Sequence, residues 1–463
     1  MIVLNRSMME RYEIADRRPK TLRAVLFGLD PMMLCTAARL LDRANERGGD
    51  LGAVCITGSG EAAALRDQDC MFTLLVRGEN EDGSPIREER VVQSILDVAD
   101  VDGGAHYAAR PEIDLFMMRA PVDPEDYVEQ VAVLTHYLRL RCEANLPAPH
   151  VLLLERMPTD RSIPDLRACI DEFARHIEEP GFAEWINGAP FQSLLVDSLF
   201  GELRETEFAK AQREMNYQDR FLLWAEPQLV CVAEKPLPEA LAAVCDAVDF
   251  NLACERKRRV FDSLLFICAS VGFLSGMDSF SQVLRDEELR AFIGRAFFDE
   301  LLPVLPWSRE EIAPCVISAF SRLENSLNDV PLLQECLMDS FRRSMLPSIR
   351  AHADREFEAP PRLTLAFSAA IMIYAGARQS GSIYEVIRGA DRFVIRDVPR
   401  FLEAFSQFAH DMPAESLAYA VLADRYLWGE DLREIDGFEL RVALDLASIQ
   451  RVGFWETLRQ RER

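Results

Sequence analysis

The feature that most constrains the fold of this chain is a change in hydrophobic periodicity near its middle. In the first half, short apolar runs alternate with amphipathic stretches, whereas from about residue 255 almost every segment repeats its apolar residues with a helical period. Strands that alternate with helices are typical of βαβ units and a mainly parallel sheet. The sequence therefore predicts an α/β, Rossmann-like domain over 1–245, followed by an all-helical domain over 246–463.

The apolar runs and helical stripes of the first half place its main elements. Buried strands are predicted at 22–28, 52–57, 113–118 and 150–156, and helices at 31–47 and 123–144. Residues 71–78 and 86–95 flank a turn-forming segment at 81–85 and predict a β-hairpin. These elements alternate as βαβ units do, which predicts a mainly parallel sheet.

The charge of the chain excludes some classes of function. There are 76 acidic and 52 basic residues, which gives a net charge of −24. Such a charge opposes binding to a nucleic-acid backbone, so we expect no nucleic-acid partner and a small-molecule ligand instead. No uncharged apolar run is long enough to cross a bilayer, and the first residues lack a secretory apolar region. The sequence predicts a cytoplasmic protein with no membrane partner.

The cysteine and histidine residues give no sign of a metal site. The eleven cysteines show no CxxC spacing and lie mostly in apolar runs, and the six histidines are dispersed. They are typical of reduced, buried cysteines and of histidines without a shared ligand. We therefore predict no metal and no disulfide framework.

Lysine is rare in this chain. Only four of the 52 basic residues are lysines, at positions 20, 210, 235 and 257, and the others are arginines. Arginine stays protonated at any working pH and cannot replace lysine as a proton-transfer group. A lysine at a chemically plausible position, such as Lys257, is therefore a candidate for function.

Several motifs, in order along nearly the whole chain, resemble a known family. They are QDCMFTLLVRG (68–78), NYQDRFLLWAEP (216–227), ERKRRVFDSLLF (255–266), FRRSMLP (341–347) and PRLTLAF (361–367). The series resembles the long-chain mannitol dehydrogenase family, most closely its tagaturonate reductase (altronate oxidoreductase) branch. The resemblance implies an NAD-binding Rossmann domain, a helical substrate domain, and a catalytic lysine at their junction.

The turn after the first strand is the candidate phosphate-binding site. The resemblance places Phe27, Gly28 and Leu29 at the cofactor, and Gly28 matches a family glycine. The second glycine position holds Asp30, whose carboxylate would repel a pyrophosphate. Asp30 followed by Pro31 is a good helix N-cap, so we expect an ordinary capped helix here and weak NAD binding.

A second cofactor contact is predicted at Val196 and Asp197. They match the family's VDR step, which lines the nicotinamide and substrate, although Ser198 replaces the arginine. The alternative is that Asp197 is an N-cap residue on a surface turn.

The candidate catalytic residues are Lys257 and Asp262. In the family a K-x4-N-x2-H pattern supplies a lysine that protonates the reacting oxygen, and an asparagine and histidine that polarise it. Here Asp262 replaces the asparagine and Leu265 the histidine. A nearby carboxylate favours the charged form of a lysine. We expect Lys257 to be at least partly buried and paired with an acid.

Two functions remain open from the sequence. The first is an NAD-dependent oxidoreductase that transfers hydride between a polyol or sugar-acid alcohol and its ketone, with Lys257 as acid/base. The second is a non-catalytic binding or regulatory relative that keeps the scaffold and has lost cofactor and catalytic contacts. Lys257 favours the first, and Asp30 favours the second.

Overall fold

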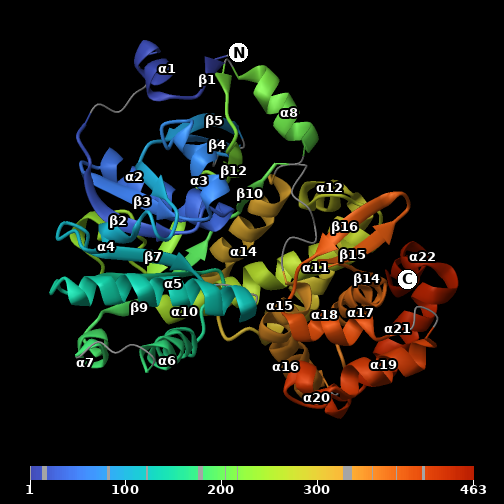
Figure 1. Ribbon diagram of the computed structural model, residues 1–463. Coiled ribbons are helices and arrows are strands. Elements are labelled where there is room, and N and C mark those ends of the chain that lie inside the picture. Colours follow the sequence, from blue (N-terminus) through green and yellow to red (C-terminus); the bar gives the residue numbers. More distant parts are fainter. Residues whose placement is uncertain are drawn as a thin grey trace. The chain divides into compact units, whose positions relative to one another are not determined.

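The chain divides into two compact units, Met1–Cys254 and Glu255–Arg463. The computed structural model describes residues 2–12, 18–80, 84–120, 124–175, 181–203, 205–215, 217–326, 336–356, 358–381, 383–408 and 412–462. The division lies within helix α10 (Phe250–Arg256), whereas the sequence placed the domain boundary between residues 245 and 246. Figure 1 labels helices and strands of both units.

A seven-stranded sheet forms the centre of the first unit. Its order is β13-β9-β8-β7-β2-β3-β6, and every neighbouring pair is parallel except β13 with β9. The strands are β2 (Thr21–Phe27), β3 (Leu51–Ile56), β6 (Ile95–Ala99), β7 (Leu115–Arg119), β8 (His150–Glu155), β9 (Phe191–Asp197) and β13 (Val230–Ala233). The order along the sheet reverses between β2 and β7, which lie side by side in Figure 1. In a doubly wound sheet this reversal marks the ligand-binding crevice, and the predicted Rossmann-like fold is confirmed.

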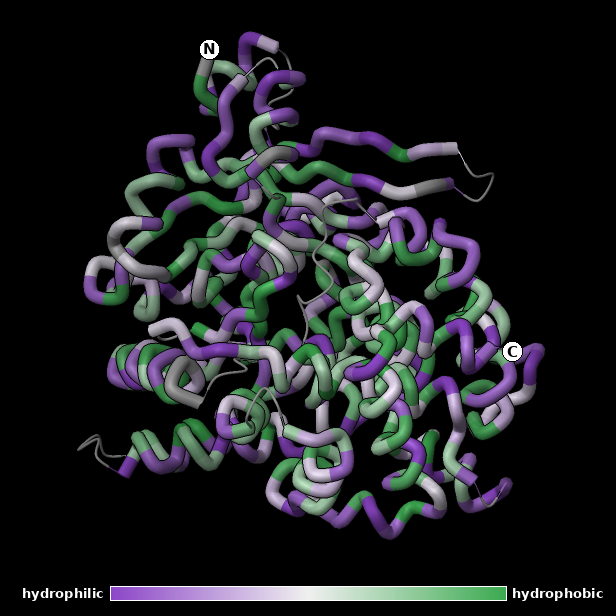
Figure 2. The backbone as a smooth tube through the Cα atoms, turned by 90° about the vertical axis from the view of Figure 1, so that its right-hand side faces the viewer, coloured by the Kyte–Doolittle hydropathy of each residue, from purple (hydrophilic) through white to green (hydrophobic). Residues whose placement is uncertain are grey.

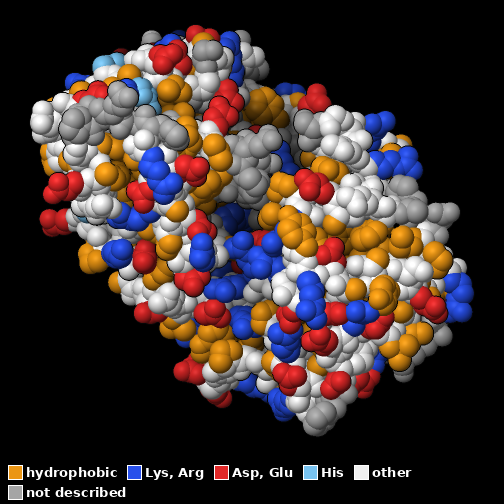
Figure 3. All heavy atoms as spheres, turned by 60° about the horizontal axis from the view of Figure 1, so that its bottom comes forward, with side chains coloured by type: hydrophobic (Ala, Val, Ile, Leu, Met, Phe, Trp, Pro, Cys, Tyr) orange, Lys and Arg blue, Asp and Glu red, His pale blue; other side chains and the backbone are white. Residues whose placement is uncertain are grey.

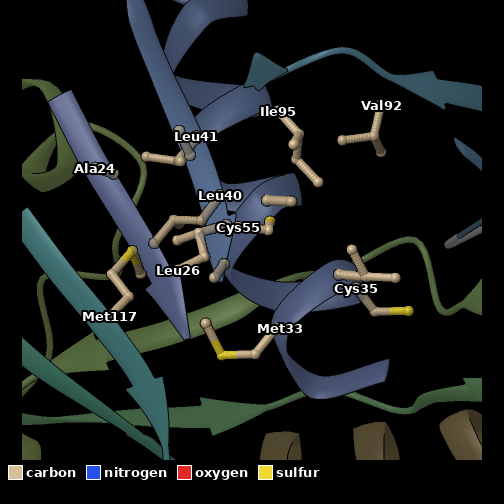
Figure 4. Close-up of a cluster of buried hydrophobic side chains, with 14 of the residues drawn as sticks. Ala24, Leu26, Met33, Cys35, Leu40, Leu41, Cys55, Val92, Ile95 and Met117 are labelled. Carbon is tan, nitrogen blue, oxygen red and sulfur yellow. The ribbon is translucent and has the colours of Figure 1, made fainter. Parts of the chain in front are cut away.

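Successive side chains of the strands belong alternately to two hydrophobic clusters. Ala24 and Leu26 of β2 belong to one cluster, and Val25 and Phe27 belong to the other. This division follows from the two-residue period of a strand, which sends successive side chains to opposite faces of the sheet. Figure 4 shows the first cluster, where side chains of β2 and β3 meet those of the helix that follows β2.

Helices cover both faces of this sheet. Residues of η1, α2 and α3 belong to the first cluster, whereas residues of α4, α5, α6 and α7 belong to the second. The helical segments of the unit are α1 (Arg6–Arg11), η1 (Met33–Ala38), α2 (Arg39–Glu46), α3 (Ser59–Arg66), α4 (Ala105–Ala108), α5 (Pro124–Glu143), α6 (Ser162–Ala174), α7 (Phe182–Asn187), α8 (Glu205–Glu214) and α9 (Glu239–Ala242). The predicted helices at 31–47 and 123–144 are therefore confirmed.

A smaller sheet of order β10-β12-β4-β5 carries the predicted hairpin. Its strands are β10 (Phe200–Glu202), β12 (Leu223–Ala225), β4 (Phe72–Glu79) and β5 (Pro85–Val92), and β1 (Ile2–Val3) pairs separately with β11 (Tyr217–Gln218). Strands β4 and β5 are antiparallel, and Figure 2 shows hydrophilic residues along β5, the edge strand. The predicted turn at 81–85 lies largely outside the described residues, since 81–83 are among those not described.

A buried hydrogen-bond network explains two of the family-like motifs. The Asp219 carboxylate accepts hydrogen bonds from Gln68 Nε2 at 2.8 Å, Thr73 N at 2.5 Å and Phe221 N at 2.8 Å. Gln68 Oε1 in turn accepts from Arg220 N at 2.6 Å. QDxxφT and NYQDRF are thus structural in this chain, because they satisfy each other's buried polar groups.

The second unit is mainly helical. Its α-helices are α11 (Ser263–Leu274), α12 (Phe280–Arg285), α13 (Glu287–Arg295), α14 (Arg309–Glu324), α15 (Leu337–Ser340), α16 (Leu346–Glu356), α17 (Pro361–Ala375), α18 (Pro399–Ser406), α19 (Ala414–Ala423), α20 (Arg425–Trp428), α21 (Phe438–Val452) and α22 (Phe454–Glu462). Wider π turns are η2 (Lys257–Asp262), η3 (Ala296–Leu301) and η5 (Phe341–Met345), and the 3₁₀ turns are η4 (Leu302–Val304) and η6 (Leu432–Glu434).

The prediction of an all-helical second domain needs correction. Strands β14 (Ala377–Ser380), β15 (Ile383–Arg388) and β16 (Asp391–Ile395) form a three-stranded antiparallel sheet. Gly381 and Gly389 have φ of +66° in the two turns, a conformation that glycine adopts readily. Val386 and Ile395 are buried while Ile383 and Ile387 are exposed, so the segment has the two-residue period of a strand.

The PRLT motif has a structural role at the start of α17. Glu300, which is 3% exposed, accepts hydrogen bonds from Arg362 N at 2.9 Å and Leu363 N at 2.9 Å, and pairs with the Arg362 guanidinium at 3.1 Å. A carboxylate at a helix N-terminus satisfies free amide groups and interacts favourably with the helix dipole. Glu462 of α22 binds the other side of Arg362 at 2.8 Å, which fixes the last helix to the unit.

Among the described helices, none is long and apolar enough to cross a membrane. The surface drawn in Figure 3 mixes acidic, basic and hydrophobic side chains.

Candidate functional site

The carboxyl end of β2 forms the turn that the sequence singled out. Gly28 has φ of +108° and donates its amide to Ile56 O of the neighbouring strand at 2.8 Å. Asp30 Oδ1 accepts from Met32 N at 2.9 Å and from Met33 N at 3.4 Å, at the start of the next helix. The capped-helix prediction is confirmed, because the side chain of Asp30 satisfies amide groups that the helix leaves free.

Arg119 is the ionic partner of Asp30. It is the last residue of β7, and its Nε lies 3.4 Å from Asp30 Oδ2. Burial raises the pKa of Asp30, and Arg119 lowers it. Because β2 and β7 are the strands between which the sheet order reverses, this ion pair lies at the candidate ligand crevice of the first unit.

Acidic residues also lie at the end of β8 and in the helix that follows β3. After β3, Thr57 Oγ1 donates to Glu61 Oε2 at 2.8 Å, which holds the exposed glutamate near the strand end. At the end of β8, Glu155 is 6% exposed and accepts from Ser162 Oγ and Ser193 Oγ, each at 2.6 Å. Glu61 lies in the first turn of helix α3, whereas Glu155 is engaged by neighbouring serines.

The five predicted cofactor residues have different surroundings. Phe27 packs edge-on against two aromatic rings in one hydrophobic cluster, and Leu29 and Val196 are buried in the other. Gly28 forms the turn, and Asp197 is the half-buried last residue of β9, paired with Val230. The alternative that Asp197 caps a helix is wrong, since β10 follows it. Their roles toward a cofactor stay predictions.

The turn at Gly28 does not fit a pyrophosphate in the present arrangement. A dinucleotide fold binds pyrophosphate through free amides at the start of the helix after the first strand. Here the amides of Met32 and Met33 already bind the Asp30 carboxylate, and a second anion would be repelled. Binding of NAD therefore requires that Asp30 give up these amides.

The second unit contains the predicted catalytic pair. Lys257 Nζ lies 2.6 Å from Asp262 Oδ1, and the two side chains are 3% and 9% exposed. The expectation of a buried lysine paired with an acid is confirmed. Residues five positions apart point in different directions on an α-helix, but the π turn η2 is wider and brings these two together.

Aromatic and basic groups surround this pair. Lys257 Nζ lies 5.8 Å from the centre of the Phe261 ring. The guanidinium of Arg322, from α14, lies 4.1 Å from the centre of the same ring. Leu265, where the family pattern has a histidine, is 3% exposed. The site can hold a proton on Lys257, but a leucine cannot polarise a substrate oxygen.

Among the residues that the structure describes, no group of three or more His, Cys, Asp or Glu side chains could hold a metal ion.

Two of these residues escaped the sequence analysis. They are Arg119 and Arg322, and neither lies in the motifs that the sequence analysis singled out. A charge search could have noted Arg119, because it interrupts an apolar strand at its carboxyl end, where ligands bind. Nothing in the sequence indicates that Arg322 stacks on Phe261.

Comparison with curated proteins finds relatives that are named altronate oxidoreductase. The chain is 26% identical over 420 residues to an altronate oxidoreductase of Klebsiella pneumoniae, covering 83% of this chain and 85% of the relative. It is 27% identical over 431 residues to the altronate oxidoreductase of Shigella flexneri, covering 86% and 87%. No family model matches the chain.

Solved structures share the fold along the whole chain. Pseudomonas fluorescens mannitol 2-dehydrogenase, in a ternary complex with NAD and D-mannitol, matches with a TM-score of 0.76 and 16% identity, covering 99% of both chains. A substrate-free D-sorbitol dehydrogenase matches with a TM-score of 0.71 and 15% identity, covering 99% of this chain and 100% of the other.

Proposed function

Because this chain belongs to the mannitol dehydrogenase family, close to the altronate oxidoreductases, we propose that it is an oxidoreductase that interconverts a polyol or sugar acid and its ketone. The observation that carries the proposal is the buried Lys257–Asp262 pair, which occupies the stretch that resembles the catalytic lysine segment of the family. Keto-hexuronates such as tagaturonate are the first substrates to test.

Lys257 would act at the substrate oxygen. When a ketone is reduced, its oxygen gains negative charge and needs a proton, which the Lys257 ammonium can donate. The Asp262 carboxylate, 2.6 Å from Nζ, holds the lysine side chain in place through an ion pair. Reduction of the ketone would take the proton from Lys257, and oxidation of the alcohol would return it.

NAD is the cofactor that the resemblance implies, and Asp30 is the reason to expect weak binding. Gly28, Glu61 and Asp197 are the proposed contacts in the first unit, and the turn at Gly28 would receive a pyrophosphate only once Asp30 gives up the amides of Met32 and Met33. Lys257 and Asp262 both belong to the second unit, and NADH, when bound, would supply the hydride.

The test is NADH consumption on addition of tagaturonate. We expect Lys257→Ala to lower kcat at least a hundred-fold, since general acid catalysis contributes about 10²–10⁴-fold. Lys210→Ala is the matched control, because that lysine is more than half exposed and pairs only loosely with Glu207, at 3.8 Å. Full activity in a folded Lys257→Ala protein would overturn the proposal.

A second candidate is favoured by Asp30. If the carboxylate never leaves the helix amides, the chain is a non-catalytic relative that binds a sugar acid without turnover. Sugar-acid binding by calorimetry, together with no NADH binding and no activity even in Asp262→Asn/Leu265→His, would support this candidate against the first.

A further inference from the structure

One side of helix α21 in the second unit is exposed and mainly apolar. Leu440 and Leu444 are 67% and 60% exposed, and Ala447 and Arg451 are exposed as well. These four residues, which we call the α21 stripe, lie on one side of the helix because their spacing follows its period of 3.6 residues. Single exposed leucines are ordinary in a soluble protein, whereas neighbouring ones on one helix are typical of a contact surface.

The other side of α21 packs against its own unit. Phe438, Val442, Leu446 and Ile449 are buried there, again with helical spacing. The core of the unit therefore explains the buried side of the helix. It does not explain the leucines of the α21 stripe, because they leave most of their surface in water.

A hollow lies beside the α21 stripe, between α21 and the neighbouring helix α19. It has a volume of about 480 Å³ and is lined by Pro413, Ala414, Glu415, Ala447, Gln450 and Arg451. Gln450 Nε2 donates to Met412 O at 3.1 Å, which holds the start of α19 beside the end of α21 (Figure 1). Because Ala414 and Ala447 have small side chains, the hollow can receive a larger apolar side chain from another molecule.

The two ends of the α21 stripe carry opposite charges. Asp436 is exposed just before the helix begins, and Glu439 is in its first turn. Arg451 is in the last turn. Each charge suits the dipole of its own helix. Together with the apolar middle, they make a surface that is complementary to a second copy of itself turned end over end.

We propose that the α21 stripe is the contact surface of a symmetric dimer, in which the α21 helices of two copies pack antiparallel across a two-fold axis. With both Leu444 side chains near the axis, Leu440 of one copy faces Ala447 and the hollow of the other copy. In the same register, Arg451 of one copy faces Asp436 of the other. A large side chain thus meets a small one, a base meets an acid, and the two helix dipoles are opposed.

The match between the two ends of one helix favours a second copy over an unrelated partner. An unrelated partner needs only to fit the leucines, and it would not require an acid and a base at equal distances from Leu444. The surface lies wholly within the second unit, and the dimer is independent of the proposed oxidoreductase activity.

Sedimentation velocity of the full chain, from about 1 µM to about 100 µM, tests the dimer. We expect the wild-type chain to pass from monomer to dimer over this range, with a Kd on the order of 10 µM. The contact is expected to be weak because one helix from each copy makes a small interface. The net charge of −24 also opposes self-association.

Leu444→Arg tests the apolar middle of the surface. It places a cation of each copy near the axis, where the two repel, and should raise the Kd at least about ten-fold. The matched control is Ile317→Arg, the same kind of change at a residue of α14 that is 69% exposed, and its Kd should stay within about two-fold of the wild type. Should Leu444→Arg fold poorly, Leu440→Ser removes the side chain that faces the hollow and should also weaken the dimer.

Exchange of the two end charges tests the antiparallel register. Arg451→Asp and Asp436→Arg should each raise the Kd about five-fold, because each brings like charges together across the axis. The double variant restores opposite charges at both contacts and should return the Kd to within about two-fold of the wild type. A purely structural role of these residues within one chain would not produce this recovery.

Any of three results would disprove the dimer. The first is a wild-type chain that is still monomeric at about 100 µM. The second is a dimer whose Kd is the same in Leu444→Arg and Ile317→Arg, which would place the contact on another surface. The third is a double charge variant that associates no better than either single variant, which would contradict the proposed pairing of Arg451 with Asp436.

Discussion

Buried carboxylates are satisfied differently in the two units of this protein. In the first unit, Glu155 and Asp219 receive hydrogen bonds from serine hydroxyls, backbone amides and a glutamine. In the second unit, Asp262 and Asp339 pair with lysine and arginine side chains. Asp30 and Asp397 are exceptions, since Asp30 has both amides and Arg119, and Asp397 has neutral donors alone.

The difference has consequences for substitution. Changing a carboxylate held by neutral donors to an amide leaves no cation uncompensated, so its effect comes from altered hydrogen bonds and from any proton that the carboxylate binds. When a carboxylate paired with a cation is replaced by a neutral side chain, the cation is left without its counter-charge. When the cation is replaced instead, the carboxylate is left without its counter-charge. The two units should therefore respond differently to similar changes, and four predictions follow in order of expected size.

The largest effect is expected for Lys257→Ala. This change leaves Asp262 buried without its cation, which should lower the free energy of unfolding by about 3–5 kcal/mol. Urea unfolding followed by circular dichroism measures the change. Lys210→Ala, at an exposed pair, should cost less than about 0.5 kcal/mol. If Lys257→Ala and Lys210→Ala lower the free energy of unfolding by equally small amounts, the Lys257–Asp262 ion pair contributes no more to stability than an exposed pair does.

The next effect concerns Asp397, the neutral-donor exception in the second unit. Burial raises its pKa from 3.8 to about 7, so the folded chain keeps a proton that the unfolded chain releases between these values. Its contribution to stability therefore falls as pH rises through about 4–7 and is constant above. Asp397→Asn removes this loss and should be the more stable protein at pH 8, by up to about 4 kcal/mol at about 1.4 kcal/mol per pKa unit.

Chemical unfolding of both proteins at pH 4, 5, 6, 7 and 8 tests this prediction. The stability difference between Asp397→Asn and the wild type should grow from pH 4 to pH 7 and then stay level. Parallel curves over the whole range would show that Asp397 titrates alike in the folded and unfolded chains.

A smaller effect is expected for Glu155→Gln in the first unit. The glutamine oxygen can accept from one serine hydroxyl, and its amide can donate to the other, because a hydroxyl both donates and accepts. We expect a loss of about 1 kcal/mol in the free energy of unfolding, measured in urea. A loss as large as that of Lys257→Ala would erase the contrast between the units.

The smallest effect is on cofactor affinity at Asp30. Removing the carboxylate in Asp30→Gly should tighten NADH binding by about 1 kcal/mol, roughly five-fold, because a like charge leaves the helix N-terminus. Fluorescence titration with NADH measures this change. Asp30→Asn keeps an oxygen on the amides without the charge, and it should fall between the two. Affinities unaffected by either change would mean that the dinucleotide, if bound, does not approach this turn.

The sequence was most informative where function or folding depends on residues close together in the chain. The strands at 22–28 and 150–156 and the helix at 123–144 follow from local periodicity alone. The cap at Asp30 follows from its position before Pro31. The sheet at 377–395 was missed because three short strands within a helical half give a weak signal, although Gly381 and Gly389 mark its turns.

By itself, the sequence determined the order of elements, the resemblance to a family, and the choice of Lys257 as the candidate acid/base. The tertiary structure decided which charges meet. Arg119 reaches Asp30 because β7 lies beside β2, and Arg400 reaches Asp339 because α18 places it there. The π turn at 257–262 made Asp262 the partner of Lys257. Local patterns depend on neighbours in the chain, whereas these contacts depend on packing between distant segments, which one sequence does not specify by periodicity.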